Sequence, residues 1–178
     1  MQSYMGVNEG NDGIIGKLLY YSTANILIPK DKFIELGNAF NLPKVKPARE
    51  SAASAYRYAT TALKDRIAEK DACGTHIYRI YCRDNKQDTS DIICRELVKE
   101  TLDSTTNNYK KLANIAFKRE TEEMYYDNTE YDSQVDVTGC CERALTLYER
   151  FKSCYNTDHV DSVVQLLLEK MQAVKINI

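Results

Sequence analysis

The stretch HIYRIYCR, residues 76–83, decides the fold class because its side chains alternate between two sets. One set carries both arginines and consists of Ile77, Arg79, Tyr81 and Arg83. The other set consists of His76, Tyr78, Ile80 and Cys82. A period of two residues, combined with β-branched and aromatic side chains, is typical of a strand. Residues 76–83 therefore predict a β-strand that exposes different chemistry on its two faces.

Three further segments extend this strand into a sheet. Asp91–Leu102 follows a polar turn and is predicted to pair back as the second strand, although its apolar spacing also suits a helix. Leu112–Phe117 alternates again, and Lys118–Glu122 is expected to turn the chain into a last strand at residues 124–126. The prediction is an antiparallel central sheet of about four strands over residues 75–127.

Helical periodicity is expected on both sides of this sheet. Residues 1–12 predict a loose lead-in, and residues 13–70 predict helices at 14–19, at 29–40 and from Pro47 to Lys70. The apolar stripe of the longest helix consists of Ala52, Ala55, Tyr56, Ala59, Ala62, Leu63 and Ile67. Two later stripes, with a turn at 156–158, predict a C-terminal antiparallel helical hairpin over residues 137–174. Helices, sheet and helices in this order favour a segregated α+β fold.

Length and charge limit the remaining choices. A chain of 178 residues that is 43% hydrophobic, without a long linker, predicts a single domain over residues 1–178. The net charge of −2 gives no overall attraction to nucleic acid or to an anionic membrane. No apolar run reaches the roughly 20 residues of a membrane span, and no signal peptide is apparent. We expect a cytoplasmic protein whose six cysteines are reduced.

The sequence contains no recognisable catalytic arrangement. Residues 10–17 resemble a phosphate-binding loop only superficially, because their glycine spacing is wrong and Leu18 replaces the hydroxyl residue. We expect His159 to lie on the surface and His76 to be structural. A zinc site that includes Cys82 and Cys94 is disfavoured relative to free thiols, because no C-x-x-C pair is present. We therefore predict a protein that is not an enzyme, with no catalytic residue, no metal and no cofactor.

The most unusual region is residues 120–136, which hold seven acidic side chains and no Lys or Arg. It is either a solvated acidic loop or an acidic, tyrosine-bearing surface that docks on a basic groove of a partner. The candidate partner-binding residues are Glu120, Glu122, Glu123, Tyr125, Tyr126, Asp127, Glu130, Tyr131 and Asp132.

Two alternatives involve other surfaces. Arg79 and Arg83, with Tyr78 and Tyr81, would suit a nucleic-acid-binding or nucleic-acid-processing accessory protein. A homodimer through the C-terminal helices is the other alternative, and its apolar residues are Tyr148, Phe151, Leu167, Leu168 and Met171. A small basic cluster is interpreted as a solvated surface and consists of Lys30, Lys32, Lys44, Lys46 and Arg49.

The stretches IIGKLLYYSTANILIP, residues 14–29, and FKRETEEMYYD, residues 117–127, resemble accessory proteins encoded by phages and prophages of Firmicutes. This resemblance implies a location in the cytoplasm of a bacterial host. It also implies a role as a non-enzymatic inhibitor or adaptor, such as an anti-CRISPR protein that evades host defence by binding a nuclease such as Cas9. The resemblance carries no individual functional residue.

Overall fold

The computed structural model describes residues 3–8, 14–21, 23–24, 26–44, 51–71, 74–85, 89–102 and 107–173. The chain divides into two compact units, of which the first comprises residues 1–46 and 156–178 and the second residues 47–155. The single domain expected from the sequence stays a prediction. The α+β class is confirmed, because helices accompany antiparallel sheets.

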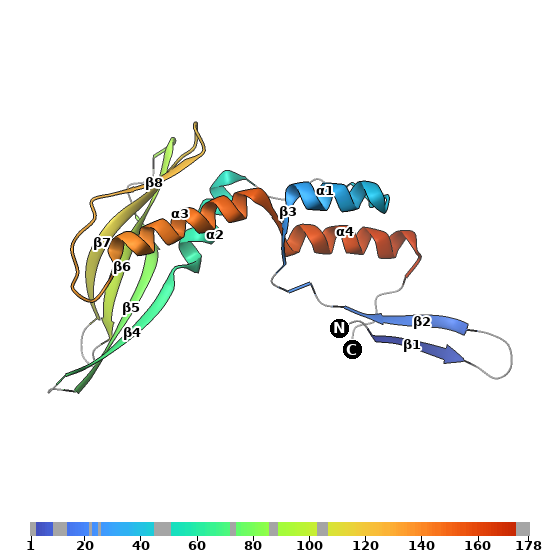
Figure 1. Cartoon of the computed structure of the whole chain (residues 1–178), viewed down its shortest axis with the longest axis horizontal. Coiled ribbons are helices and arrows are strands. Elements are labelled where there is room, and N and C mark those ends of the chain that lie inside the picture. The colour runs from blue at the N-terminus through green and yellow to red at the C-terminus, as the bar shows by residue number, and fades with distance from the viewer. Residues whose placement is uncertain are drawn as a thin grey trace. The chain divides into compact units, whose positions relative to one another are not determined.

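The second unit is built around a five-stranded antiparallel sheet with the strands in chain order (Figure 1). The strands are β4 (Lys64–Asp71), β5 (Gly74–Asp84), β6 (Ile92–Leu102), β7 (Asn107–Lys118) and β8 (Glu123–Asp127). The predicted strands and the turn after Lys118 are therefore confirmed, including the strand that also suited a helix. Helix α2 (Ala52–Ala62) precedes the sheet, and α3 (Val137–Ser153) follows it and packs on α2.

Three aromatic rings join both helices to one face of the sheet. Tyr56 of α2 stacks on Phe117 of β7 with ring centroids 5.5 Å apart, and Tyr148 of α3 meets the same ring edge-on at 6.0 Å. The Tyr56 hydroxyl donates to the carbonyl of Ile115 at 2.8 Å, and the Tyr148 hydroxyl donates to that of Glu122 at 2.6 Å. Buried hydroxyls need such acceptors, so these hydrogen bonds orient the two tyrosine rings within the core.

The prediction of four strands and of a helix continuing to Lys70 is wrong. Helix α2 ends at Ala62, and residues 64–71 form β4, which pairs with β5 in register from Lys64 opposite Tyr81 to Asp71 opposite Gly74. Ala, Glu and Lys in this segment favour a helix only slightly, and pairing with a neighbouring strand overrides that preference. The start of α2 also differs from the prediction, because Ser51 caps it through its side chain. Pro47 lies outside the described residues.

The first unit begins with a strand pair in place of the predicted lead-in and first helix. Strand β1 (Ser3–Asn8) pairs antiparallel with β2 (Ile14–Tyr20), with Ser3 opposite Tyr20. The expected helix at 14–19 is wrong because a short apolar run fits either a strand or a helix. The unit also contains helix α1 (Lys30–Ala39), as expected, and helix α4 (Thr157–Lys170). It includes strand β3 (Leu27–Pro29), and strand β9 (Cys154–Asn156) directly precedes α4 in the sequence.

The predicted C-terminal helical hairpin is also wrong. Both helices form, and the Asn156 side chain caps α4 by accepting from the backbone N–H of His159 at 3.1 Å. However, strand β9 separates α3 from α4, and the two helices belong to different units. His159 is buried, contrary to the prediction, and its ring meets that of Phe33 in α1 at 5.3 Å. Apolar periodicity thus identified each helix but not the element that it packs against. No helix in the described part of the chain is long and apolar enough to cross a membrane.

A buried ion-pair network anchors the loop between β8 and α3. The Asp132 carboxylate, whose side chain is only 6% exposed, accepts from Lys99 Nζ at 3.0 Å and from Lys110 Nζ at 2.9 Å. The backbone N–H of Gln134 also donates to it at 3.0 Å. Burial raises the pKa of Asp132, but these hydrogen bonds outweigh burial and lower the pKa to about 2. Asp132 is thus a structural residue of this unit.

We predict that Asp132→Asn lowers the free energy of unfolding by about 2 kcal/mol at neutral pH, because it removes a charge that both lysines stabilise. A depressed pKa in the folded state contributes stability above the unfolded value of 3.8, and this contribution is lost as the pH falls toward 2. The difference in unfolding free energy between wild type and variant should therefore shrink across that pH interval. Urea unfolding followed by circular dichroism at several pH values measures it, and a constant difference would contradict the assignment.

Candidate functional site

The face of the five-stranded sheet opposite α2 and α3, here called the open face, carries a concentration of cations and tyrosines. Its side chains lie in cross-strand rows. The first row is Arg66, Arg79, Glu100 and Tyr109. The second row is Lys64, Tyr81, Val98 and Lys111. The third row is Arg83, Glu96, Asn114 and Asp127.

Two glutamates of β6 hold the arginines of β5 in place. Arg79 Nη2 lies 3.0 Å from a carboxylate oxygen of Glu100, whose side chain is only 3% exposed. In the next-but-one row, Arg83 donates through Nε and Nη2 to one oxygen of Glu96, at 3.0 and 2.9 Å. The carboxylates are sunk between the strands, whereas about half of each arginine side chain stays exposed. Solvent therefore meets mainly the positive ends of these pairs.

The edge strand β4 adds further positive charge. Lys64 and Arg66 are exposed on the open face, and neither forms an ion pair within the described residues. Lys111 of β7 approaches the second oxygen of Glu96 at 3.6 Å. The three rows thus contain five cations, Lys64, Arg66, Arg79, Arg83 and Lys111, beside the sunken carboxylates of Glu96 and Glu100. This excess of positive charge is local, because the chain as a whole has a net charge of −2.

Two tyrosines lie among these cations. The Arg83 guanidinium carbon lies 5.4 Å from the centre of the Tyr109 ring, and Tyr109 is 48% exposed. Burial raises the pKa of Tyr81, and the Glu100 carboxylate and a hydrogen bond with Tyr109 raise it further. The Tyr81 phenol is therefore neutral at physiological pH. Tyr109 offers a rigid aromatic surface that solvent or a ligand can reach.

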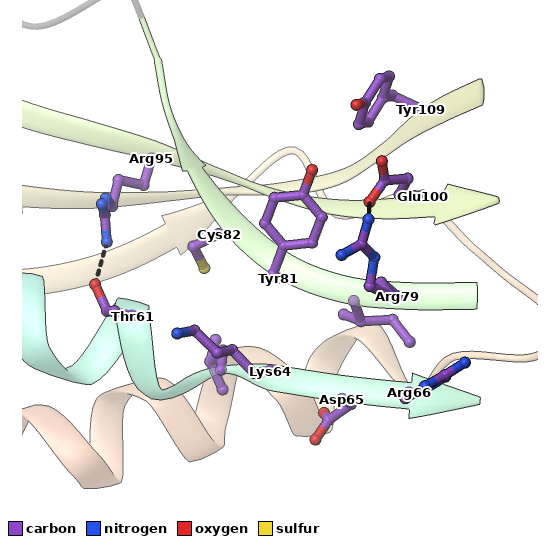
Figure 2. Close-up of a pocket in the computed structure, with 12 residues that line it drawn as sticks. Thr61, Lys64, Asp65, Arg66, Arg79, Tyr81, Cys82, Arg95, Glu100 and Tyr109 are labelled. Carbon is purple, nitrogen blue, oxygen red and sulfur yellow. Dashed lines mark hydrogen bonds and ion pairs between the residues drawn. The ribbon is translucent and has the colours of Figure 1, made fainter. Parts of the chain in front are cut away.

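A cleft of about 720 Å³ runs along β4 and β5 at the edge of this face. Figure 2 shows Arg79 directed toward Glu100 near Tyr81 and Tyr109, and Arg95 near the end of α2. The cations and tyrosines that line the cleft are Lys64, Arg66, Arg79, Arg95, Tyr81 and Tyr109. Its volume is in the range of pockets that hold small organic ligands. The cleft combines groups that bind anions with groups that stack on planar rings.

The cysteines of the sheet differ in burial and in the face on which they lie. Cys82 lines the cleft, but burial raises its pKa to about 12, so its thiol lacks the thiolate form that a nucleophile needs. Cys82 packs toward the helices, whereas Cys94 lies on the opposite face of the sheet, opposite Ala116 in β7. These two thiols do not converge. Among the residues that the structure describes, no group of three or more His, Cys, Asp or Glu is arranged to hold a metal.

The acidic segment predicted from the sequence serves several separate roles. Tyr126 is half-buried and packs against the core, whereas Tyr125 points to the other face and is 39% exposed. Asp127 accepts from the Asn114 side chain at 2.9 Å, and Asp132 belongs to the buried network described above. Tyr126, Asp127 and Asp132 of the predicted docking surface therefore make contacts within the fold.

The remaining acidic residues are exposed but lie at opposite ends of β8. Glu120, Glu122 and Glu123 surround the β7–β8 turn, where Lys152 lies 3.7 Å from the Glu122 carboxylate. Glu130 and Tyr131 follow the far end of β8, and Tyr131 is 87% exposed. Five residues of strand separate the two groups by roughly 17 Å. The segment thus presents two small acidic surfaces.

The residues of the nucleic-acid hypothesis are largely brought together. Arg79, Arg83 and Tyr81 share the open face, as their alternation predicted, whereas Tyr78 lies on the other face with the Lys99 ammonium 4.5 Å from its ring. Sequence reasoning missed four residues of this surface, namely Lys64, Arg66, Tyr109 and Lys111. The alternation that marks these residues is present in the sequence. However, residues 64–70 were predicted as a helix, and the predicted strand began at Leu112, whereas β7 begins at Asn107.

The small basic cluster lies in the first unit. Lys30 and Lys32 belong to the first turn of α1, and Lys44 is exposed beyond the end of that helix. Lys32 pairs with Glu35 at 3.3 Å in an exposed contact, which contributes little to stability. Lys46 and Arg49 lie outside the described residues. The interpretation of this cluster as a solvated surface stays a prediction.

Comparison with known proteins places the chain in a family. No curated protein and no solved structure matches it. A model of a family of unknown function, DUF6744, matches residues 14–178, which include all of the sheet and of its open face. The chain therefore belongs to DUF6744, a family whose function is unknown.

Proposed function

We propose that this protein works by binding and not by catalysis, and that the open face of its sheet recognises a negatively charged macromolecule. The observation that carries the proposal is the asymmetry of the two ion pairs of β5 and β6. Their carboxylates are sunken while Arg79 and Arg83 reach solvent. A partner approaching this face meets guanidinium groups first.

The geometry supports binding through preorganisation. An arginine held by a carboxylate loses less rotational freedom when it binds a ligand, so more of the interaction energy appears as affinity. Lys64 and Arg66 on the neighbouring strand add charge that no ion pair within the described part of the chain offsets. Charges of one sign gathered on one face also accelerate association with an anionic partner.

We predict that the double variant Lys64→Glu/Arg66→Glu weakens binding to heparin by about tenfold or more at roughly 50 mM salt, because the sulfate groups of heparin lose two cationic contacts. The slope of log affinity against log salt should also fall, by about 1.5. Titration of fluorescent heparin at several salt concentrations measures both quantities.

The matched control is Lys32→Glu/Lys44→Glu, which makes the same change in net charge on exposed residues of the first unit. It should bind heparin like the wild type to within about twofold. The proposed function is wrong if the wild-type protein does not bind heparin at low salt. It is equally wrong if both double variants lose affinity to the same extent, since binding would then follow net charge alone.

A second candidate is the function expected first from the sequence, namely docking of the acidic segment on a basic groove of a protein. The observation that favours it is the exposure of Tyr131, at 87%, beside the exposed carboxylate of Glu130. Exposed tyrosines are frequent anchors of protein interfaces. By the resemblance to phage accessory proteins, the partner would be a nuclease such as Cas9, and the protein would be its inhibitor.

For this candidate we predict that the wild-type protein slows DNA cleavage by Cas9 and that Glu120→Lys/Glu123→Lys/Glu130→Lys abolishes the effect. These exposed carboxylates are not part of the Asp132 network, so the fold should be retained. A control with the same change in charge is Glu142→Lys/Glu149→Lys/Glu169→Lys on exposed positions of α3 and α4. Unaltered cleavage in the presence of wild-type protein, or equal loss of inhibition in both variants, would contradict this candidate.

A further inference from the structure

We infer that the macromolecule bound by the open face is single-stranded nucleic acid, with phosphates held by the β4 and β5 cations and a base stacked on Tyr109. This inference rests on the proposed function and names the class of its ligand. The supporting observation is that the cross-strand rows place arginines next to aromatic rings.

The first step concerns the phosphates. Arg66 and Arg79 are directly opposite each other in adjacent strands, and Lys64 lies two residues from Arg66 on the same face. Two like charges placed directly opposite on neighbouring strands repel one another, so a bound anion between them removes an unfavourable interaction. Glu100 offsets only one member of this group, since it pairs with Arg79. The group therefore keeps an excess of positive charge that a phosphodiester can neutralise.

The second step concerns the bases. Tyr109 is in the same row as Arg79 and Glu100, and the Arg83 guanidinium packs 5.4 Å from its ring centre. The residue nevertheless remains 48% exposed, so a further planar group can reach the ring. Stacking of a base on an aromatic side chain is favourable whichever base is present. Tyr81 lies in the adjacent row of the same face.

The third step distinguishes a single strand from a duplex. The bases of a duplex are already stacked on each other, so an aromatic ring on a sheet surface cannot stack on them without opening the helix. Only an unpaired strand offers phosphates and free base faces to the same surface. Sheet faces that carry aromatic and basic side chains are a recurrent solution for binding such strands.

The open face also limits where the strand can lie. On β8 its side chains are Glu123, Tyr125 and Asp127, so Tyr125 is flanked by two carboxylates. Phosphates are repelled there, which confines the strand to the part of the face formed by β4 to β7. The cleft of about 720 Å³ extends around the β4 edge. Lys64, Tyr81 and Tyr109 line it on this part of the open face, and Asp65, Ile80 and Cys82 line it on the covered face.

The inference is tested by measuring the affinity of the full chain for fluorescent probes at low salt. The probes are a thymidine 20-mer, a uridine 20-mer, a 20-base-pair DNA duplex and heparin, the last of which has charge but no bases. We expect the wild type to bind at least one single strand more tightly than the duplex. Tyr109→Ala should weaken that binding by about tenfold, whereas Tyr109→Phe should change it by less than about threefold. Heparin affinity should not change in either variant.

The control for loss of an exposed tyrosine is Tyr131→Ala, which should leave the affinity for single strands unchanged. Circular dichroism and the melting temperature establish that Tyr109→Ala is folded, and Tyr109→Leu serves if it is not. Duplex binding as tight as single-strand binding overturns the inference, as does equal binding of the strand by wild type and Tyr109→Ala. If heparin binds through the open face but neither single strand binds, the inference fails and the proposed function stands. If no probe binds, both fail.

Discussion

The packing of Tyr56, stacked, and Tyr148, edge-on, against the ring of Phe117 is the contact on which the second unit depends. It brings one ring from each helix to a single residue of β7, and both tyrosine hydroxyls are satisfied by backbone carbonyls. Because large rings bury more apolar area than any other side chains, this cluster determines which face of the sheet is covered. The helices that precede and follow the sheet both pack on that face, and the opposite face is left to solvent.

A face left to solvent needs polar side chains, and β5 and β6 supply them as ion pairs. Burying the carboxylates of Glu96 and Glu100 costs desolvation energy, so these pairs are weak contributors to stability. Their effect is on position, since each guanidinium is held at a fixed place above the sheet. Val98 is completely buried between them although it lies outside the main core. The open face is therefore a packed surface on which ion pairs hold Arg79 and Arg83 in position.

The sequence predicted the α+β class and the strands of the sheet except β4, because alternation in β5 and β7 is strong and is bounded by turns. The prediction from sequence was wrong where the local residue pattern and pairing with a neighbouring strand favour different structures. Residues 64–71 have helical composition but pair with β5, and residues 14–20 fit either period. In the candidate site, alternation placed Arg79, Tyr81 and Arg83 together correctly. Cross-strand neighbours such as Tyr109 could not be assigned, because register depends on a bulge after Leu97 that leaves no mark in the sequence.

Strand β4 also determines how other chains can approach this unit. It is an edge strand in the described part of the chain, so one row of its backbone N–H and C=O groups has no described strand beside it in the sheet. Its charged residues lie on both faces, with Lys64 and Arg66 on one and Asp65 and Glu69 on the other. A peptide that adds to this edge as a sixth strand would place its own side chains next to these charges on both faces. This disfavours pairing with an identical copy and pairing with an apolar peptide. Growth of this sheet into a shared intermolecular sheet is therefore disfavoured at the β4 edge.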